Sequence, residues 1–186
     1  MNVILLPGSG CAPTLECNYY AWLRRALLDR GLVADVRVTV PSMPDAQLCR
    51  RKFWIPHCED VLRADERSIV VGHSSGAVCA LRLAERNRLR GIVLVAGYDD
   101  DLGDAGERAS GYFDDAFDYE AIKANCGGGE RPRIDCVIGM RDSLVPPEMQ
   151  RALAVKLGAR ETLCERRDHF FTSPAEEIVE AIRRFL

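Results

Sequence analysis

Short runs of consecutive apolar residues alternate along the chain with segments in which apolar residues recur at helical spacing. The run Ile92-Val93-Leu94-Val95 is apolar throughout, which is typical of a strand that is covered on both faces of a sheet. The apolar runs predict strands at residues 2–6, 34–40, 68–72, 91–96, 133–139 and 160–164. The spacing predicts helices near residues 18–30, 52–64, 75–87, 118–125, 147–157 and 175–186.

This alternation predicts an α/β fold with about six mostly parallel strands and helices on both faces of the sheet. The one long irregular stretch, residues 97–130, is rich in aromatic residues and ends in a triple glycine. A long loop inside a compact domain often serves function. We expect residues 1–186 to form a single domain without a separate lid domain.

Composition narrows the class of protein. Apolar residues make up 47% and charged residues 28% of the chain, as in soluble globular proteins. A net charge of −3 and scattered basic residues argue against nucleic-acid binding. No apolar run approaches the ~18 residues of a membrane span, and we expect the opening residues to form a first strand rather than a secretory signal. Eight cysteines without a CxxC pair predict reduced thiols in a cytoplasmic protein and no metal site.

The sequence Gly72-His73-Ser74-Ser75-Gly76 follows a predicted strand and opens a predicted helix. In a Gly-x-Ser-x-Gly turn of this kind the serine hydroxyl is presented above the end of a sheet, and the glycines make room for the sharp turn. We therefore expect Ser74 to be a nucleophile.

A serine nucleophile needs a general base, and the chain has three histidines. His73 directly precedes Ser74, so its side chain should point away from the reacting face. His57 lies far upstream of the turn, near a predicted helix start. His169 follows the last predicted strand, where ligands gather in open parallel sheets. His169 is therefore the predicted base.

The acid of the predicted triad should hold the imidazole in one tautomer. Asp142 follows the fifth predicted strand and lies between Ser74 and His169 in the chain, which gives a triad in the chain order Ser, Asp, His. Asp99, which follows the fourth strand, remains the alternative acid.

Two backbone N–H groups are needed to stabilise an oxyanion. The first is expected from Ser75, directly after the nucleophile. The second is expected from the loop Pro7-Gly8-Ser9-Gly10. Pro7 has no N–H, so Ser9 is predicted, with Gly10 as the alternative.

Several segments resemble the retinoblastoma-binding protein 9 family: Leu6-Pro7-Gly8-Ser9-Gly10, Gly72-His73-Ser74-Ser75-Gly76-Ala77, Asp101-Leu102-Gly103-Asp104, Glu107-Arg108-Ala109-Ser110-Gly111-Tyr112-Phe113 and Ile122-Lys123-Ala124-Asn125-Cys126. The resemblance runs nearly end to end. It implies a compact serine hydrolase of the α/β-hydrolase superfamily, with six core strands, no large lid, and a triad at Ser74, Asp142 and His169.

One departure concerns the peptide motif Leu-x-Cys-x-Glu, from which that family takes its name. The matching segment here is Leu62-Arg63-Ala64-Asp65-Glu66, with alanine in the cysteine position. The segment Leu15-Glu16-Cys17-Asn18-Tyr19 lacks the glutamate. Both differences argue against retinoblastoma binding by this chain.

The sequence therefore predicts a serine hydrolase that cleaves a small-molecule ester or amide through an acyl-enzyme, without a metal or organic cofactor. A non-catalytic interaction protein on a hydrolase fold is the alternative, and acyl transfer would use the same residues. A carboxylate of the run 99–101 is a candidate receptor for a substrate ammonium group, although a solvated charge run explains it as well. Candidate walls for an acyl group, each of which a place in the core would explain equally well, are Trp54, Leu102, Tyr112, Phe113 and Phe117.

Overall fold

The computed structural model describes residues 1–29, 36–127 and 131–186. Within these residues the strands form one six-stranded parallel sheet, in the order β2-β1-β3-β4-β5-β6. The predicted end of the first helix, at residue 30, and the predicted start of the second strand, at residues 34 and 35, lie outside the described residues. The strands are β1 (Asn2–Leu6), β2 (Arg37–Thr39), β3 (Ser68–His73), β4 (Gly91–Val95), β5 (Ile134–Gly139) and β6 (Arg160–Cys164).

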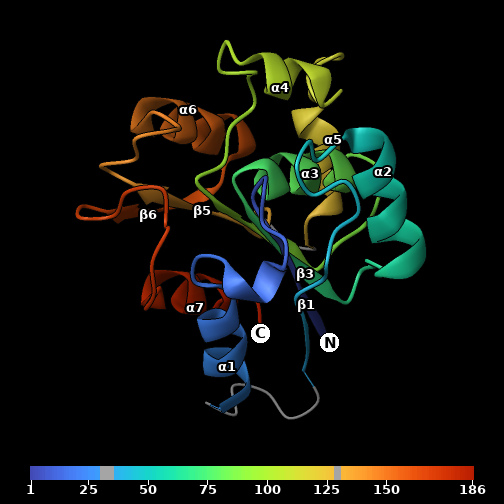
Figure 1. Cartoon of the computed structure of the whole chain (residues 1–186). Helices are drawn as coiled ribbons and strands as arrows, with labels where there is room; N and C mark the ends of the chain where they lie inside the picture. The colour runs from blue at the N-terminus through green and yellow to red at the C-terminus, as the bar shows by residue number, and fades with distance from the viewer. Residues whose placement is uncertain (30–35, 128–130) are drawn as a thin grey trace.

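Helices cover both faces of this sheet (Figure 1). Side chains alternate along β1, so that Ile4 and Leu6 pack in one apolar core and Val3 and Leu5 in the other. The first core is closed by α2 (Arg51–Pro56), α3 (Ser75–Ala84), α5 (Tyr119–Asn125) and α6 (Pro147–Leu157). The second is closed by α1 (Tyr20–Asp29) and α7 (Glu176–Arg183). The predicted α/β fold is confirmed, and the inner strands β1, β3, β4 and β5 are the ones buried on both sides.

Three short elements differ from the predicted helices. The helix expected near 52–64 ends at Pro56, which has no N–H to donate, and the chain continues as the π-helical turn η2 (His57–Val61). The 3-10 turn η1 (Thr14–Glu16) precedes α1. The helix α4 (Ala105–Ala109) lies in the stretch expected to be irregular. No described helix is long and apolar enough to cross a bilayer.

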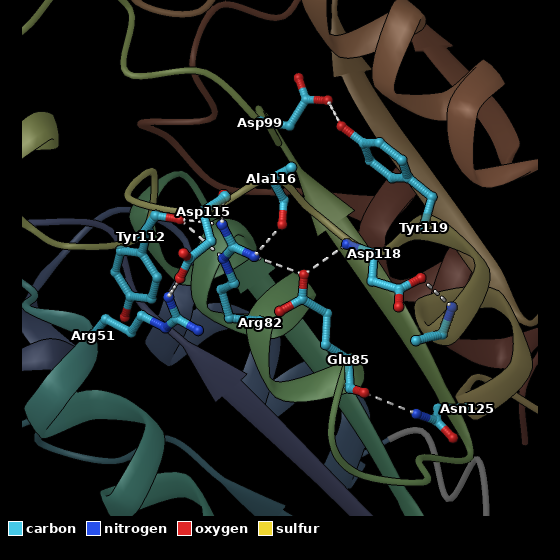
Figure 2. Close-up of polar contacts among 11 residues, drawn as sticks. Arg51, Arg82, Glu85, Asp99, Tyr112, Asp115, Ala116, Asp118, Tyr119 and Asn125 are labelled. Atoms are coloured by element: carbon cyan, nitrogen blue, oxygen red, sulfur yellow. Dashed lines mark hydrogen bonds and ion pairs between the residues drawn. The ribbon is translucent and has the colours of Figure 1, made fainter.

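A buried arginine organises the described part of that irregular stretch (Figure 2). Arg82 of α3 is 2% exposed and donates to the Tyr112 carbonyl from Nε and Nη2, at 2.9 and 2.5 Å. It also donates to the carbonyls of Asp115 and Ala116 and pairs with Glu85 at 2.7 Å. These bonds satisfy a charge that would be costly to bury alone. They attach the segment to the helix that begins at Ser75.

Candidate active site

The carboxyl ends of β1 and β3 meet at the switch point of the sheet. The chain leaves β1 for β2 on one side and later enters β3 on the other side of β1, an arrangement that opens a crevice for ligands. Leu6 pairs in register with Gly72, so the loop 7–10 begins beside the turn that holds Ser74. Asp142 and His169 follow β5 and β6 at the same edge. The topology therefore brings the predicted triad residues and the predicted oxyanion loop to one edge of the sheet.

Ser74 occupies a strained turn between β3 and α3. Its φ of 55° and ψ of −123° are unfavourable for a residue with a Cβ, and strain of this kind typically costs ~1–3 kcal/mol. The Ser74 N–H donates to the Val95 carbonyl at 3.0 Å. A Cβ on Gly72 would lie 2.3 Å from the Gly76 oxygen, and a Cβ on Gly76 would lie 2.3 Å from the Leu6 oxygen. Close backbone approach thus explains both glycines of the motif.

His169 and Asp142 form a buried pair. Nδ1 of His169 lies 3.0 Å from each carboxylate oxygen of Asp142, and the two side chains are 3% and 0% exposed. Because a carboxylate only accepts hydrogen bonds, Nδ1 carries the proton and Nε2 has the free lone pair. The pair therefore fixes the tautomer that a general base for serine requires.

Three further donors hold the Asp142 carboxylate. The backbone N–H groups of Leu144 and Val145 donate to Oδ1, and Nε2 of Gln150 donates to Oδ2, each at 2.9 Å. Burial alone would raise the pKa of Asp142, but the hydrogen bonds from His169, Val145 and Leu144 outweigh it and hold the pKa below its usual value. Gln150 was not predicted. The available signal was a polar residue in the apolar stripe that Leu153, Ala154 and Leu157 form along α6.

Asp99, the alternative acid, and Asp168, which directly precedes His169, have other partners. Asp99 accepts from Tyr119 Oη at 2.5 Å and from Lys156 Nζ at 2.6 Å. Asp168 accepts from the N–H and hydroxyl of Ser143 and from the N–H of His169, each at 2.8 Å. Asp168 thus ties the loop after β6 to the loop after β5, and the carboxylate on the imidazole belongs to Asp142.

The loop after β1 and the start of α3 supply the candidate oxyanion donors. The N–H of Ser75 begins α3, where backbone donors lack partners within the helix. In the loop, Gly8 N–H donates to Tyr20 Oη at 2.9 Å and Gly10 N–H to the Ala46 carbonyl at 2.8 Å. The hydrogen bonds among the described residues do not include the N–H of Ser9. Ser9 and Ser75 line one cavity.

This cavity is small, and most of its described lining residues have polar side chains. Its volume is about 100 Å³, and two carboxylates, those of Asp104 and Glu107, border it. Burial raises the pKa of Glu107 above its usual value, although the hydroxyls of Tyr98 and Ser75 oppose the shift. The described lining residues are Ser9, Gln47, Leu48, Cys49, Ser75, Asp104, Gly106, Glu107, Ser110 and Tyr112.

The predicted acyl-group walls lie in different places. Tyr112 borders the cavity. Trp54 is fully buried and its indole donates to the Pro44 carbonyl at 2.7 Å, so it belongs to the core and a wall role does not fit its position. Phe113 and Phe117 border a separate surface hollow beside Asp99, and Leu102 packs against the core. The described lining of the cavity is thus mainly polar rather than aromatic.

Comparison with known proteins identifies the family. Residues 21–175 match the family described as serine hydrolase. The chain belongs to the serine hydrolase family. Serine hydrolase RBBP9 of Rattus norvegicus is 33% identical over 185 residues, which cover 100% of this chain and 95% of the relative. The resemblance to the retinoblastoma-binding protein 9 family is therefore confirmed, and family membership favours an enzyme over a non-catalytic interaction protein.

Solved structures show the same fold at low identity. The ydeN gene product of B. subtilis superposes with a TM-score of 0.84 at 21% identity, over 99% of this serine hydrolase and 97% of that chain. An esterase from Exiguobacterium antarcticum superposes with a TM-score of 0.64 at 13% identity, over 100% and 91%. At these identities the two structures support the α/β-hydrolase fold.

Proposed function

We propose that Ser74, His169 and Asp142 are the catalytic triad of this serine hydrolase, and that it cleaves a small ester or amide through an acyl-enzyme. The observation that carries the proposal is the buried His169–Asp142 pair, which directs Nδ1 to the carboxylate. This leaves Nε2 as the ring nitrogen that takes a proton from Ser74. The ring centroid of His73, the residue before Ser74, is 5.0 Å from that of His169.

The reaction then follows from the protonation states. Ser74 Oγ attacks the carbonyl carbon while its proton moves to Nε2 of His169, and the negative oxygen accepts hydrogen bonds from the N–H groups of Ser75 and Ser9. Collapse of this intermediate breaks the bond to the leaving group, which takes the proton from Nε2. Water then attacks the acyl-enzyme, gives its proton to Nε2, and the acid leaves as Ser74 regains the proton. The ionised Asp142 stabilises the transient imidazolium, and no metal or organic cofactor is required.

We further propose that the cavity beside Ser75 receives a small group that is cationic or donates hydrogen bonds. Its described lining contains the carboxylates of Asp104 and Glu107 and no lysine or arginine. The carboxylates of the run 99–101 have other partners: Asp99 pairs with Lys156, Asp101 pairs with Arg108 at 3.0 Å, and Asp100 accepts from the N–H of Leu102 at 2.9 Å. Glu107 is therefore the better candidate for receiving a positive charge.

The organisation of the whole chain and its kind of substrate belong to the same proposal. We propose that residues 1–186 act as one hydrolase domain, because both apolar cores pack on the same sheet. A small molecule, rather than a nucleic acid, fits the net charge of −3.

A fluorophosphonate probe tests the triad. The native protein and a control with the exposed Ser42 replaced, Ser42→Ala, should label at equal rates, because Ser42 lies outside the site. Ser74→Ala should abolish labelling, and His169→Ala should slow it by at least about 100-fold, since the serine loses its base. Absence of labelling in the native protein, or full labelling of Ser74→Ala, would contradict the proposal.

A further inference from the structure

His73, which directly precedes Ser74, is a buried histidine that the mechanism does not use. It is 1% exposed. Its Nε2 lies 2.9 Å from the carbonyl oxygen of His169, and its Nδ1 lies 2.6 Å from Tyr20 Oη. A carbonyl oxygen only accepts, so Nε2 carries the hydrogen and Nδ1 accepts from the tyrosine. Both ring nitrogens are thus engaged, and the tautomer is fixed.

The hydroxyl of Tyr20 is also fully engaged. It donates to His73, and it accepts from the N–H of Gly8 at 2.9 Å, from Nδ2 of Asn18 at 3.2 Å and, in the longest of these contacts, from the Cys11 thiol at 3.9 Å. A hydroxyl has one hydrogen, and His73 Nδ1 receives it, so the Tyr20 oxygen accepts in its other contacts. The result is a chain of hydrogen bonds from Gly8 through Tyr20 and His73 to the His169 carbonyl, which we term the His73 chain.

Three residues of the His73 chain lie next to, or belong to, a residue that the proposed reaction uses. Gly8 precedes the oxyanion donor Ser9, His73 precedes Ser74, and the carbonyl belongs to His169 itself. The loops that follow β1 and β6 are thereby linked to the last residue of β3 through hydrogen bonds in a buried site. Catalytic groups must be held to within about 0.5 Å of the productive geometry, and loops need such support because they are otherwise the mobile part of a fold.

We propose that Tyr20 and His73 are positioning residues, which set the spacing between the oxyanion loop, the nucleophile turn and the base through the His73 chain. This inference rests on the proposed function. Burial and the nearby His169 lower the pKa of His73 to about 3, so the ring stays neutral when the enzyme works. A neutral ring keeps its lone pair for Tyr20 and does not oppose the positive charge that forms on His169, whose ring centroid is 5.0 Å away.

The adjacent tyrosine provides a matched control. Tyr19 is as fully buried as Tyr20, but its hydroxyl has no hydrogen-bond partner among the residues that the structure describes. Tyr20→Phe and Tyr19→Phe therefore remove the same atom from neighbouring buried rings, and only the first breaks the His73 chain. We expect Tyr20→Phe to lower kcat about 10- to 100-fold on an activated ester with little change in KM, and Tyr19→Phe to keep kcat within about twofold.

Nuclear magnetic resonance of ¹⁵N-labelled histidine provides a readout that a purely structural role would not move. In the native protein the His73 signals should show a protonated Nε2 and an unprotonated, hydrogen-bonded Nδ1, without titration between about pH 5 and 9. In Tyr20→Phe the Nδ1 signal should shift, and in Tyr19→Phe it should not. Thermal unfolding of both variants measures any loss of stability, so that a smaller folded fraction is not mistaken for a lower kcat.

A second pair of variants keeps the inference testable if Tyr20→Phe folds poorly. His73→Gln retains a donor for the His169 carbonyl, whereas His73→Leu removes it, so the glutamine variant should keep more of kcat. Equal kcat in Tyr20→Phe and Tyr19→Phe, or equal kcat in the two His73 variants, would overturn the inference. If fluorophosphonate labels Ser74→Ala, the proposed function itself fails. If Ser74→Ala is inert while Tyr20→Phe is fully active, the positioning role alone fails.

Discussion

Replacement of Asp142 by asparagine is the sharpest perturbation of the buried pair. The carboxylate accepts from His169, Leu144, Val145 and Gln150. An asparagine has one accepting oxygen and one donating nitrogen. If the oxygen stays with the two backbone N–H groups, the new NH₂ faces both the amide of Gln150 and Nδ1 of His169. The imidazole must then present its lone pair at Nδ1, which places the proton on Nε2 and removes the base for Ser74.

The expected losses of kcat and of stability follow from these contacts. The wrong tautomer should lower kcat by about 10³- to 10⁴-fold, as loss of the triad aspartate does in other serine hydrolases. Stability should fall as well, because hydrogen bonds to a charged group contribute ~1.5–3 kcal/mol each and part of them is lost. The folded-state pKa of Asp142 is depressed. Its stabilising contribution is therefore present above the pKa of the unfolded chain and is lost as pH falls through the lower folded value, so the stability difference between variant and wild type should shrink in acid.

The assay compares kcat on an activated ester with urea unfolding at neutral and acidic pH. Asp99→Asn is the matched control, because Asp99 is the other aspartate at a strand end and its partners are Lys156 and Tyr119. It should keep kcat within a few-fold of wild type. The reasoning is refuted if Asp99→Asn abolishes activity while Asp142→Asn retains it, or if Asp142→Asn loses less than tenfold in kcat.

Three further predictions follow from the packing and charge of the site. Gly76→Ala should abolish folding or lower the free energy of unfolding in urea by at least ~3 kcal/mol, because the new Cβ would lie 2.3 Å from the Leu6 oxygen. A variant as stable as the wild type would contradict the close packing of the turn. Glu107→Gln should reduce kcat/KM for a cationic ester relative to a neutral isostere. Because the pKa of Glu107 is raised, the wild-type preference for the cation should grow as pH rises through that shifted value, and a ratio that is flat with pH would refute the role. Arg82→Met should lower the free energy of unfolding in urea by ~3 kcal/mol or more, because Glu85 and the bound carbonyls lose their donor. An unchanged free energy of unfolding would show that the arginine is dispensable.

The strands and the triad candidates were readable from the sequence for physical reasons. A sheet covered on both faces requires continuous apolar runs, so β3, β4 and β5 were recognisable as strands. The carboxyl ends of parallel strands meet at one edge, which is why the sequence predicts Asp142 and His169 near Ser74.

Other features carried no such local signal. The helix α4 has no buried residue, so no apolar stripe marks it, and it depends on the Asp104 side chain accepting from the Glu107 N–H. In the case of Trp54, the sequence does not distinguish an aromatic residue of the core from one in a pocket wall. The bond between Tyr20 and His73 joins residues 53 positions apart, and only the packing of α1 against the sheet brings them together.

The most direct test of the proposed mechanism is to locate the covalent intermediate by mass spectrometry. The native enzyme is treated with a fluorophosphonate, digested, and compared with Ser74→Ala and with Ser75→Ala, the serine next to it in the motif. We predict a single adduct on Ser74 in the native protein and in Ser75→Ala, and none in Ser74→Ala. An adduct on Ser75, on Ser9 or on a cysteine, or an adduct that persists in Ser74→Ala, would contradict the assignment of Ser74 as the nucleophile.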